Sequence, residues 1–248
     1  IIFCSSPFDH QSVDLLHELD VPFFKVASGE ITNLPLLEHI SSYGKPIILS
    51  TGMSNLDEIE DALNAIGEKG RKQVVLMHCI STYPANWEDA NLRAIKSLRE
   101  AFNLPVGFSD HSTGIELSLV AVGMGAVIIE KHITVSKEMD GGDHIASLDM
   151  DEFRDLVSKI RRIEGALGDG IKRCIHSEEN VKEVARKSIV SRRTVDIGKI
   201  ITSDDLVIKR PGVGIPPKYL SMIIGAKAKE SILADKLIKW SQLDLQNK

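Results

Sequence analysis

Residues 105–132 read PVGFSDHSTGIELSLVAVGMGAVIIEKH, two apolar strand-like runs separated by one helical crossover. Each run ends in a histidine with a polar residue two positions earlier, Ser109 before His111 and Glu130 before His132. Residues two apart on a strand project from the same face, so each histidine shares a face with its polar partner. If both strands belong to one parallel barrel, two imidazoles and a carboxylate converge at its C-terminal mouth, where barrel enzymes have their active sites. Such side chains form a ligand set for a divalent metal.

The alternation of a short apolar strand and an amphipathic helix continues on both sides of this stretch. Capping residues mark the helix starts, for example a predicted capping box of Ser54 with Asp57 and a later start at Asp149 or Asp151. Near-continuous apolar strands are typical of a sheet that helices cover, either open or closed into a barrel. The predicted strands are IIFCSS (1–6), FFKVAS (23–28), PIILST (46–51), QVVLMHC (73–79), PVGFSD (105–110) and AVIIEKH (126–132).

These six units predict an α/β fold. A (β/α)8 TIM barrel has about 250 residues, so six units in roughly 168 residues indicate a barrel lacking its first two β/α units in this chain. A doubly wound open sheet is the alternative, because periodicity does not distinguish the two. The chain opens inside an apolar run, residues 1–4, without an initiating methionine. We therefore expect an N-terminally truncated fragment, poorly stable and inactive because its sheet edges are open.

Bulk composition sets modest limits on function. Of the 248 residues 43% are hydrophobic and 26% charged, and the net charge is −5. This balance argues against a general affinity for nucleic acid or for an anionic membrane, while a local anion site stays possible. Three widely spaced cysteines indicate a reducing compartment rather than a disulfide framework. With no secretory signal visible, a cytoplasmic location is expected.

The pattern of predicted secondary structure changes near Gly168. Residues 1–168 are predicted to form the partial barrel, and residues 169–186 are a polar, charged linker with a short helical stretch. Residues 187–248 alternate short β-like pieces with turns and one short helix, PKYLSMIIG. This last segment is predicted to be a small α+β domain.

Eight motifs in order give the chain a resemblance to the bacterial N-acetylneuraminate (sialic acid) synthase family. They are SSPFD, KVASGEITN, KPIILSTGMS, HCISTYP, GFSDHSTGIE, IIEKHIT, GGDHIASL and KRPGVGI. The resemblance implies a TIM barrel followed by a C-terminal antifreeze-like (SAF) domain. It also implies condensation of phosphoenolpyruvate with an N-acetylmannosamine-type sugar to a nine-carbon sialic acid and phosphate, assisted by Mn²⁺ (or Mg²⁺ or Co²⁺), in a homodimer with domain-swapped C-terminal domains.

The residues themselves support the metal and anion sites. His111 and His132 are predicted to hold the metal, with Glu130 binding a metal-bound water or orienting a ligand. Hydrogen-bonded core histidines are the alternative. Lys25, mid-strand among apolar residues, is better explained by a substrate carboxylate or phosphate than by a solvated face.

The resemblance assigns further site residues. It places Ser6, Lys25, Ser28, Ser50, Ser81 and Ser109 around phosphoenolpyruvate, although such serines also cap strand ends. It places Glu30, Tyr83 and Asp143 near the sugar hydroxyls, while Glu30 alternatively caps the next helix. Arg210 is expected to reach into the barrel mouth of the partner subunit and to bind the N-acetyl group of the sugar there. His78 and Cys79 are interpreted as core residues or as neighbours of the ligands.

Three functions stay open at this point. The first is the sialic acid synthase, the second a sister enzyme that makes legionaminic or pseudaminic acid, and the third a non-catalytic carbohydrate-binding barrel. Joint presence of Lys25, Glu30, the two histidines, Asp143 and Arg210 speaks against the third.

Overall fold

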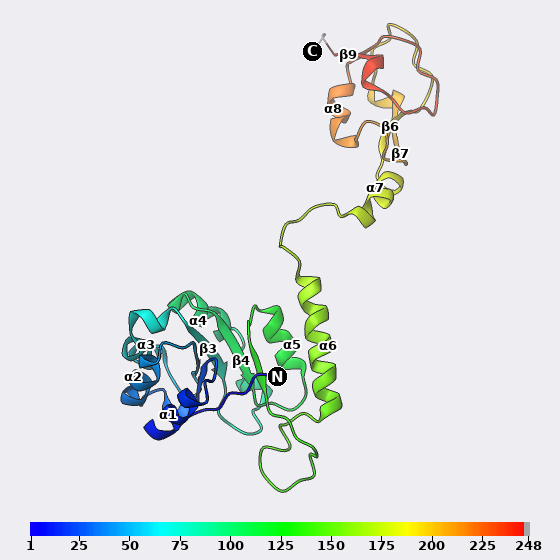
Figure 1. Ribbon diagram of the computed structural model, residues 1–248. Coiled ribbons are helices and arrows are strands. Elements are labelled where there is room, and N and C mark those ends of the chain that lie inside the picture. Colours follow the sequence, from blue (N-terminus) through cyan, green and yellow to red (C-terminus); the bar gives the residue numbers. More distant parts are fainter. Residues whose placement is uncertain (246–248) are drawn as a thin grey trace. The chain divides into compact units, whose positions relative to one another are not determined.

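The computed structural model describes residues 1–245 and divides the chain into two compact units (Figure 1). The first unit is Ile1–Gly170, and the second begins at Ile171. Within residues 1–245 no helix combines the length and the apolar character needed to cross a bilayer.

The first unit is built on a parallel five-stranded sheet in the order β1-β2-β3-β4-β5. Because the strand order follows the chain without a reversal, the alternative of a doubly wound sheet is wrong. The sheet instead curls as part of a barrel wall, and a count of eight units stays a prediction. The strands are β1 (Phe24–Val26), β2 (Ile47–Ser50), β3 (Val74–Cys79), β4 (Val106–Asp110) and β5 (Ile129–Lys131).

Helices connect these strands and cover the sheet. Core side chains from the strands and helices, such as Phe24, Leu37 and Leu76, are fully buried, and each contributes about 1.5–3 kcal/mol to folding. Helix α2 packs against α3, and α5 against α6. The helices are α1 (His10–Glu18), α2 (Leu34–Ser42), α3 (Leu56–Arg71), α4 (Ala94–Phe102), α5 (Glu116–Gly123) and α6 (Met150–Leu167), with short 3-10 turns η1 (Ser28–Glu30) and η2 (Trp87–Asp89).

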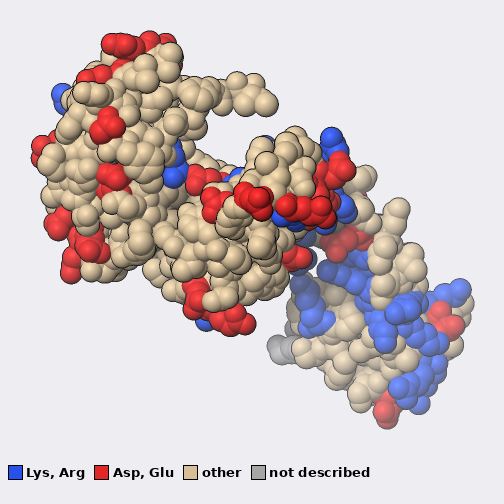
Figure 2. Space-filling model, turned by 90° about the horizontal axis from the view of Figure 1, so that it is seen from below, with Lys and Arg blue, Asp and Glu red and all other residues tan. Residues whose placement is uncertain are grey.

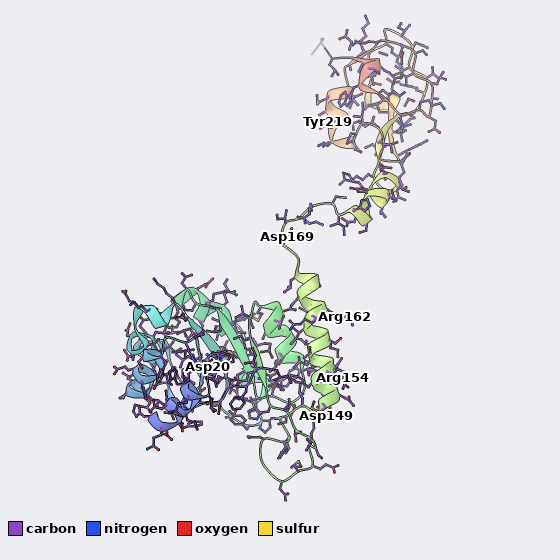
Figure 3. The ribbon with its side chains drawn as sticks, viewed as in Figure 1. Asp20, Asp149, Arg154, Arg162, Asp169 and Tyr219 are labelled. Carbon is purple, nitrogen blue, oxygen red and sulfur yellow. The ribbon has the colours of Figure 1, made fainter. Side chains whose placement is uncertain are left out.

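Capping residues set the helix starts. Asp149 accepts backbone hydrogen bonds at the N-terminus of α6, along which Arg154 and Arg162 lie (Figure 3). The predicted capping box of Ser54 and Asp57 is wrong by one position, because Asn55 is the residue with extended backbone before α3. Its side chain accepts from the Glu58 amide, and Glu58 accepts in return from the Asn55 amide.

The predicted first strand is also wrong. Residues 1–6 form no strand, and Ile1, Ile2 and Phe3 are exposed. An apolar run becomes a strand only when a neighbouring strand satisfies its backbone groups, and among residues 1–245 β1 pairs with β2 alone. The run passes instead beside the carboxyl ends of the strands.

The second unit is made of short antiparallel pairs, as predicted for its sequence. Strand β6 pairs with β7 and β8 with β9 around a core that includes Ile189, Val195 and Ile238. The predicted helix at residues 217–225 forms as a 3-10 turn followed by one helical turn. The elements are η3 (His176–Glu178), α7 (Glu179–Ala185), β6 (Ser188–Ser191), η4 (Ser203–Asp205), β7 (Leu206–Lys209), η5 (Pro217–Tyr219), α8 (Leu220–Ile223), β8 (Lys227–Ala228), η6 (Trp240–Gln242) and β9 (Leu243–Asp244).

Candidate active site

A cavity of about 620 Å³ lies at the carboxyl ends of the five parallel strands. It collects ten of the residues that the sequence singled out, although they come from six separate stretches of chain. Side chains that share the inner face of neighbouring parallel strands converge at this end of a curled sheet. The ten are Ser6, Lys25, Ser28, Ser50, Ser81, Tyr83, Ser109, His111, Glu130 and His132.

A polar chain crosses one wall of the cavity and balances the charge of Lys25. The Lys25 ammonium donates to Ser50 Oγ at 2.8 Å and lies 3.4 Å from Glu130 Oε2. Glu130 Oε1 in turn accepts from the Ser109 hydroxyl at 2.9 Å. The half-buried lysine therefore has a carboxylate partner that borders the cavity, and an incoming anion meets both a cation and hydroxyl donors there.

A second group of hydroxyls is packed around Gly52, which the sequence reasoning missed. The Gly52 amide donates to Ser28 Oγ at 3.0 Å, and Ser28 Oγ is 3.2 Å from Cys79 Sγ. A Cβ atom on Gly52 would lie 2.3 Å from Ser81 Oγ and 2.8 Å from Ser28 Oγ. Glycine is therefore required here for space. The only sequence signal was the glycine that follows the strand in ILSTGMS.

The two imidazoles lie next to the polar chain that ends at Ser109, with ring centroids 5.4 Å apart and planes nearly perpendicular. His111 Nδ1 lies 2.7 Å from the Ile80 carbonyl, an acceptor, so Nδ1 carries the proton and Nε2 keeps its lone pair. Burial lowers the pKa of His111, against the opposing effect of the Ile80 hydrogen bond, so the neutral form prevails at pH 7.

The Nε2 lone pair of His111 has a single neighbouring donor. Ser109 Oγ lies 3.2 Å from it, but the one hydroxyl proton of Ser109 also reaches Glu130 at the shorter distance of 2.9 Å. When Ser109 donates to Glu130, the imidazole nitrogen is free to bind a cation. The Tyr83 ring lies beside both imidazoles and is tilted against them, with its centroid 4.2 Å from that of His111, and burial raises the pKa of Tyr83.

Three predicted residues are not among those that line the cavity. Glu30 accepts a hydrogen bond from Asn33 Nδ2 at 2.7 Å, which is the local role before α2 that the sequence left open. Asp143 lies in an exposed loop with Oδ2 3.8 Å from His132 Nδ1. Arg210 belongs to the second unit, where it is exposed and donates to the Ala185 carbonyl.

The neighbouring pair His78 and Cys79 divides between core and cavity. His78 is buried, its Nε2 lies 2.8 Å from the Ala90 carbonyl, and burial lowers its pKa. It is a core histidine, as predicted. Cys79 is also buried but lines the cavity beside Ser28.

Comparison with known proteins decides the family. The model of the NeuB family matches residues 1–172, and the model of the SAF domain matches residues 186–244. The chain belongs to the NeuB family. The resemblance drawn from the eight motifs is therefore confirmed, and with it the assignment to a family of sugar-acid synthases.

Two relatives and one solved structure illustrate the likeness of this NeuB-family chain. The N,N'-diacetyllegionaminic acid synthase of Campylobacter jejuni is 47% identical over 96% of this chain and 72% of its own length. Human N-acetylneuraminate-9-phosphate synthase is 36% identical over 100% of this chain and 69% of its own. The crystal structure of the spore coat polysaccharide biosynthesis protein SpsE of Bacillus subtilis superposes with a TM-score of 0.65 at 33% identity, covering 99% of this chain and 74% of that one.

Proposed function

We propose that the chain condenses phosphoenolpyruvate with an N-acetylmannosamine-type sugar to give a nine-carbon acidic sugar and phosphate. A carbon–carbon bond forms between the methylene carbon of phosphoenolpyruvate and the sugar aldehyde carbon. Water then adds to the former enol carbon, and the bond between this carbon and the phosphate oxygen breaks. The observation that carries the proposal is one cavity in which a cation and hydroxyl groups lie beside an imidazole pair, in a chain whose relatives are named sugar-acid synthases.

Lys25 and the serines form the side of the cavity suited to phosphoenolpyruvate. The Lys25 ammonium and the hydroxyls of Ser50, Ser28 and Ser109 are donors, and charge-assisted hydrogen bonds of this kind are the strong ones for carboxylates and phosphates. Ser6 and Ser81 line the same cavity and are proposed to complete the set. Glu130, which holds Lys25 and Ser109 through its two oxygens, is placed to orient both donors and to accept a proton from the water that adds.

The part of the cavity lined by the two imidazoles is suited to a divalent cation. Within residues 1–245 no three His, Cys, Asp or Glu side chains are grouped as a complete metal site. His111 and His132 nevertheless offer two ring nitrogens, with the Asp143 carboxylate close to one, and they fit a cation that takes its remaining ligands from substrate or water. Mn²⁺, Mg²⁺ or Co²⁺ held by the two imidazoles would supply a Lewis acid for the aldehyde oxygen.

The acceptor sugar is the less determined half of the proposal. Tyr83, whose ring lies beside both imidazoles, is proposed to contact the sugar hydroxyls together with Glu30 and Asp143. A 2,4-diacetamido sugar is the second candidate. It is favoured by the 47% and 42% identity to two N,N'-diacetyllegionaminic acid synthases, against 36% to the human enzyme and 35% to a pseudaminic acid synthase.

Assembly and domain division are also proposals. We propose a cytoplasmic homodimer in which residues 1–168 form the catalytic domain, 169–186 the linker and 187–248 the SAF domain, whose Arg210 binds the sugar N-acetyl group in the partner's cavity. Mixing inactive His111→Ala and Arg210→Ala subunits tests this arrangement. A swapped heterodimer regains one complete site and therefore activity, whereas an arginine that serves its own chain's cavity leaves the mixture inactive.

The central experiment measures phosphate release from phosphoenolpyruvate by the full-length protein, with and without Mn²⁺. The acceptors are N-acetylmannosamine and its 2,4-diacetamido trideoxy analogue. Release that requires both the metal and one sugar supports the synthase and selects the acceptor. A folded protein that binds either sugar but releases no phosphate contradicts the proposal and favours a carbohydrate-binding barrel.

A further inference from the structure

A buried ion pair lies behind the two histidine-bearing strands, on the face opposite the cavity. Asp110 is the last residue of β4 and precedes His111, and Lys131 is the last residue of β5 and precedes His132. The side chains of Asp110 and Lys131 therefore project away from the cavity residues. They are register partners in the sheet, and Lys131 Nζ lies 3.3 Å from Asp110 Oδ1. Their side chains are 0% and 1% exposed, the most deeply buried ion pair among residues 1–245. Neither residue has a part in the proposed chemistry.

Every oxygen of Asp110 is saturated by groups around the end of β4. Oδ1 accepts from the Ser112 amide at 2.9 Å and from the Ser112 hydroxyl at 2.6 Å, and Oδ2 accepts from Ser118 Oγ at 2.6 Å. Ser118 lies on α5, so the carboxylate ties the end of the strand to the following helix. His111 stands between two residues, Asp110 and Ser112, that this network holds.

Lys131 extends the same network to the neighbouring strand. Its ammonium donates to the Ser112 carbonyl as well as pairing with Asp110, and thus binds both chain neighbours of His111. Its own chain neighbours are Glu130 and His132. Helices α5 and α6 cover it, and it borders a small apolar cavity of about 220 Å³ with Val122 and Leu156. One buried ammonium therefore joins the backbone segments that carry both imidazoles.

Stability alone does not account for such a pair. Taking two charges out of water is costly, and well-packed apolar residues of the same volume are often equally or more stabilising. An ion pair does more than apolar packing to fix the direction and register of the groups it joins, because its hydrogen bonds are directional. What the pair joins here are the two strand ends at which the imidazoles leave the sheet.

We infer that Asp110 and Lys131 are positioning residues, which set the spacing of His111 and His132 across the sheet. The inference rests on the proposed function for its purpose but not for its test. The distance between the two imidazoles is a property of the protein whether or not a metal binds. Residues that orient metal-binding histidines in this indirect way typically change metal affinity by about 10- to 100-fold when substituted.

The test uses the full-length protein with Lys131→Met and Asp110→Asn. Each histidine is followed by NMR in the variant whose substitution lies on the other strand. The His111 side-chain ¹⁵N signals are measured in Lys131→Met, and those of His132 in Asp110→Asn. His111→Gln and His132→Gln assign the signals. We expect each cross-strand signal to move and the Kd for Mn²⁺ to rise about tenfold or more. Arg71→Met, which breaks the Arg71–Glu60 pair at 2.7 Å in the same unit, is the control and should change neither.

The inference would be overturned if the variants fold with a lowered Tm but their cross-strand signals do not move and their Kd stays within twofold of the parent. The pair would then be purely structural. If Lys131→Met does not fold, Asp110→Asn decides, since asparagine keeps the size and the Oδ1 acceptor for Ser112. If the parent itself binds no Mn²⁺, the metal part of the proposed function fails. The imidazole signals then decide the role of the pair by themselves.

Discussion

Each unit of the molecule contains a carboxylate that pairs with a lysine and accepts a hydrogen bond from a hydroxyl group. The two carboxylates differ in whether they also face a cavity. In the second unit Asp205 is fully buried and accepts from Arg193, Lys199, and both the amide and the hydroxyl of Thr202. In the first unit Glu130 accepts from Lys25 and Ser109 but is 37% exposed toward a cavity. Of these two carboxylates, only the one that also faces unfilled space can therefore meet a substrate directly.

The units also differ in charge. Residues 1–170 contain 14 Lys and Arg against 26 Asp and Glu, whereas residues 171–248 contain 16 against 9. Figure 2 shows acidic side chains predominating on the first unit and basic ones on the second. The net charge of −5 is the sum of −12 for residues 1–170 and +7 for residues 171–248. Conclusions drawn from the whole-chain value therefore apply to neither unit by itself.

The largest expected effect comes from removing an imidazole from the cavity. His111→Ala or His132→Ala should lower metal-dependent phosphate release roughly a thousandfold or more, because loss of a Lewis acid costs several kcal/mol of transition-state stabilisation. The circular dichroism spectrum should stay that of the parent. Asp205→Asn in the second unit is the matched control and should leave kcat within about twofold. Activity within a few-fold of the parent in the histidine variants would remove the metal role.

Removal of each lysine should separate binding from stability. Lys25→Met should raise the KM for phosphoenolpyruvate about 10- to 100-fold, since a charged hydrogen bond contributes about 1.5–3 kcal/mol. Lys199→Met should leave this KM unchanged and instead lower the free energy of unfolding of the second unit by a similar amount. Steady-state kinetics and urea unfolding of both variants provide the measurement. Equal effects of Lys25→Met and Lys199→Met on this KM would contradict the distinction between the Glu130 site and the Asp205 site.

Acid should unfold the first unit before the second. Burial lowers the pKa of His78 and His111, so the unfolded chain takes up their protons first, and the free energy of unfolding falls as the pH drops below about 6.5. Burial alone would raise the pKa of Asp205, but hydrogen bonds from Lys199, Thr202 and Arg193 lower it strongly. The second unit should therefore keep this contribution until the pH falls below about 4.

The two tryptophans report the units separately. Trp87 lies in the first unit and Trp240 in the second, so single-tryptophan variants followed by fluorescence give one acid transition each. His78→Gln should flatten the first transition near pH 6, and Asp205→Asn should remove the acid dependence of the second. Coincident transitions in the parent would show that the two units do not respond independently.

The smallest effects are expected at exposed ion pairs, one in each unit. Lys96 lies 3.6 Å from Glu100 on α4, and Lys209 pairs with Asp235, all with at least half of the side chain exposed. Lys96→Ala and Lys209→Ala should each change the free energy of unfolding by no more than about 0.5 kcal/mol, because solvent and salt screen such pairs. A change above 1 kcal/mol in thermal or urea unfolding would contradict this expectation.

Much of the architecture could be predicted from local pattern. Five of six strands form where apolar runs end in polar residues, because those runs have neighbours with which to pair. The sixth run, residues 1–6, has the same composition and fails, because pairing depends on a partner that no local pattern reveals. The start of α3 was predictable to within a residue, as the shift from Ser54 to Asn55 shows.

The sequence by itself determined the mid-strand position of Lys25, the strand-end positions of His111 and His132, and the family, since strand periodicity and motif order can be read directly along the chain. Only the tertiary structure decided the partners of these residues: Glu130 with Lys25, Ile80 with His111, and Lys131 with Asp110. It also decided that Gly52 leaves room for Ser28 and Ser81. The physical reason is that hydrogen bonds and close packing act over a few ångströms in space, between residues separated by 21 to 105 positions in the chain wherever separate strands contribute.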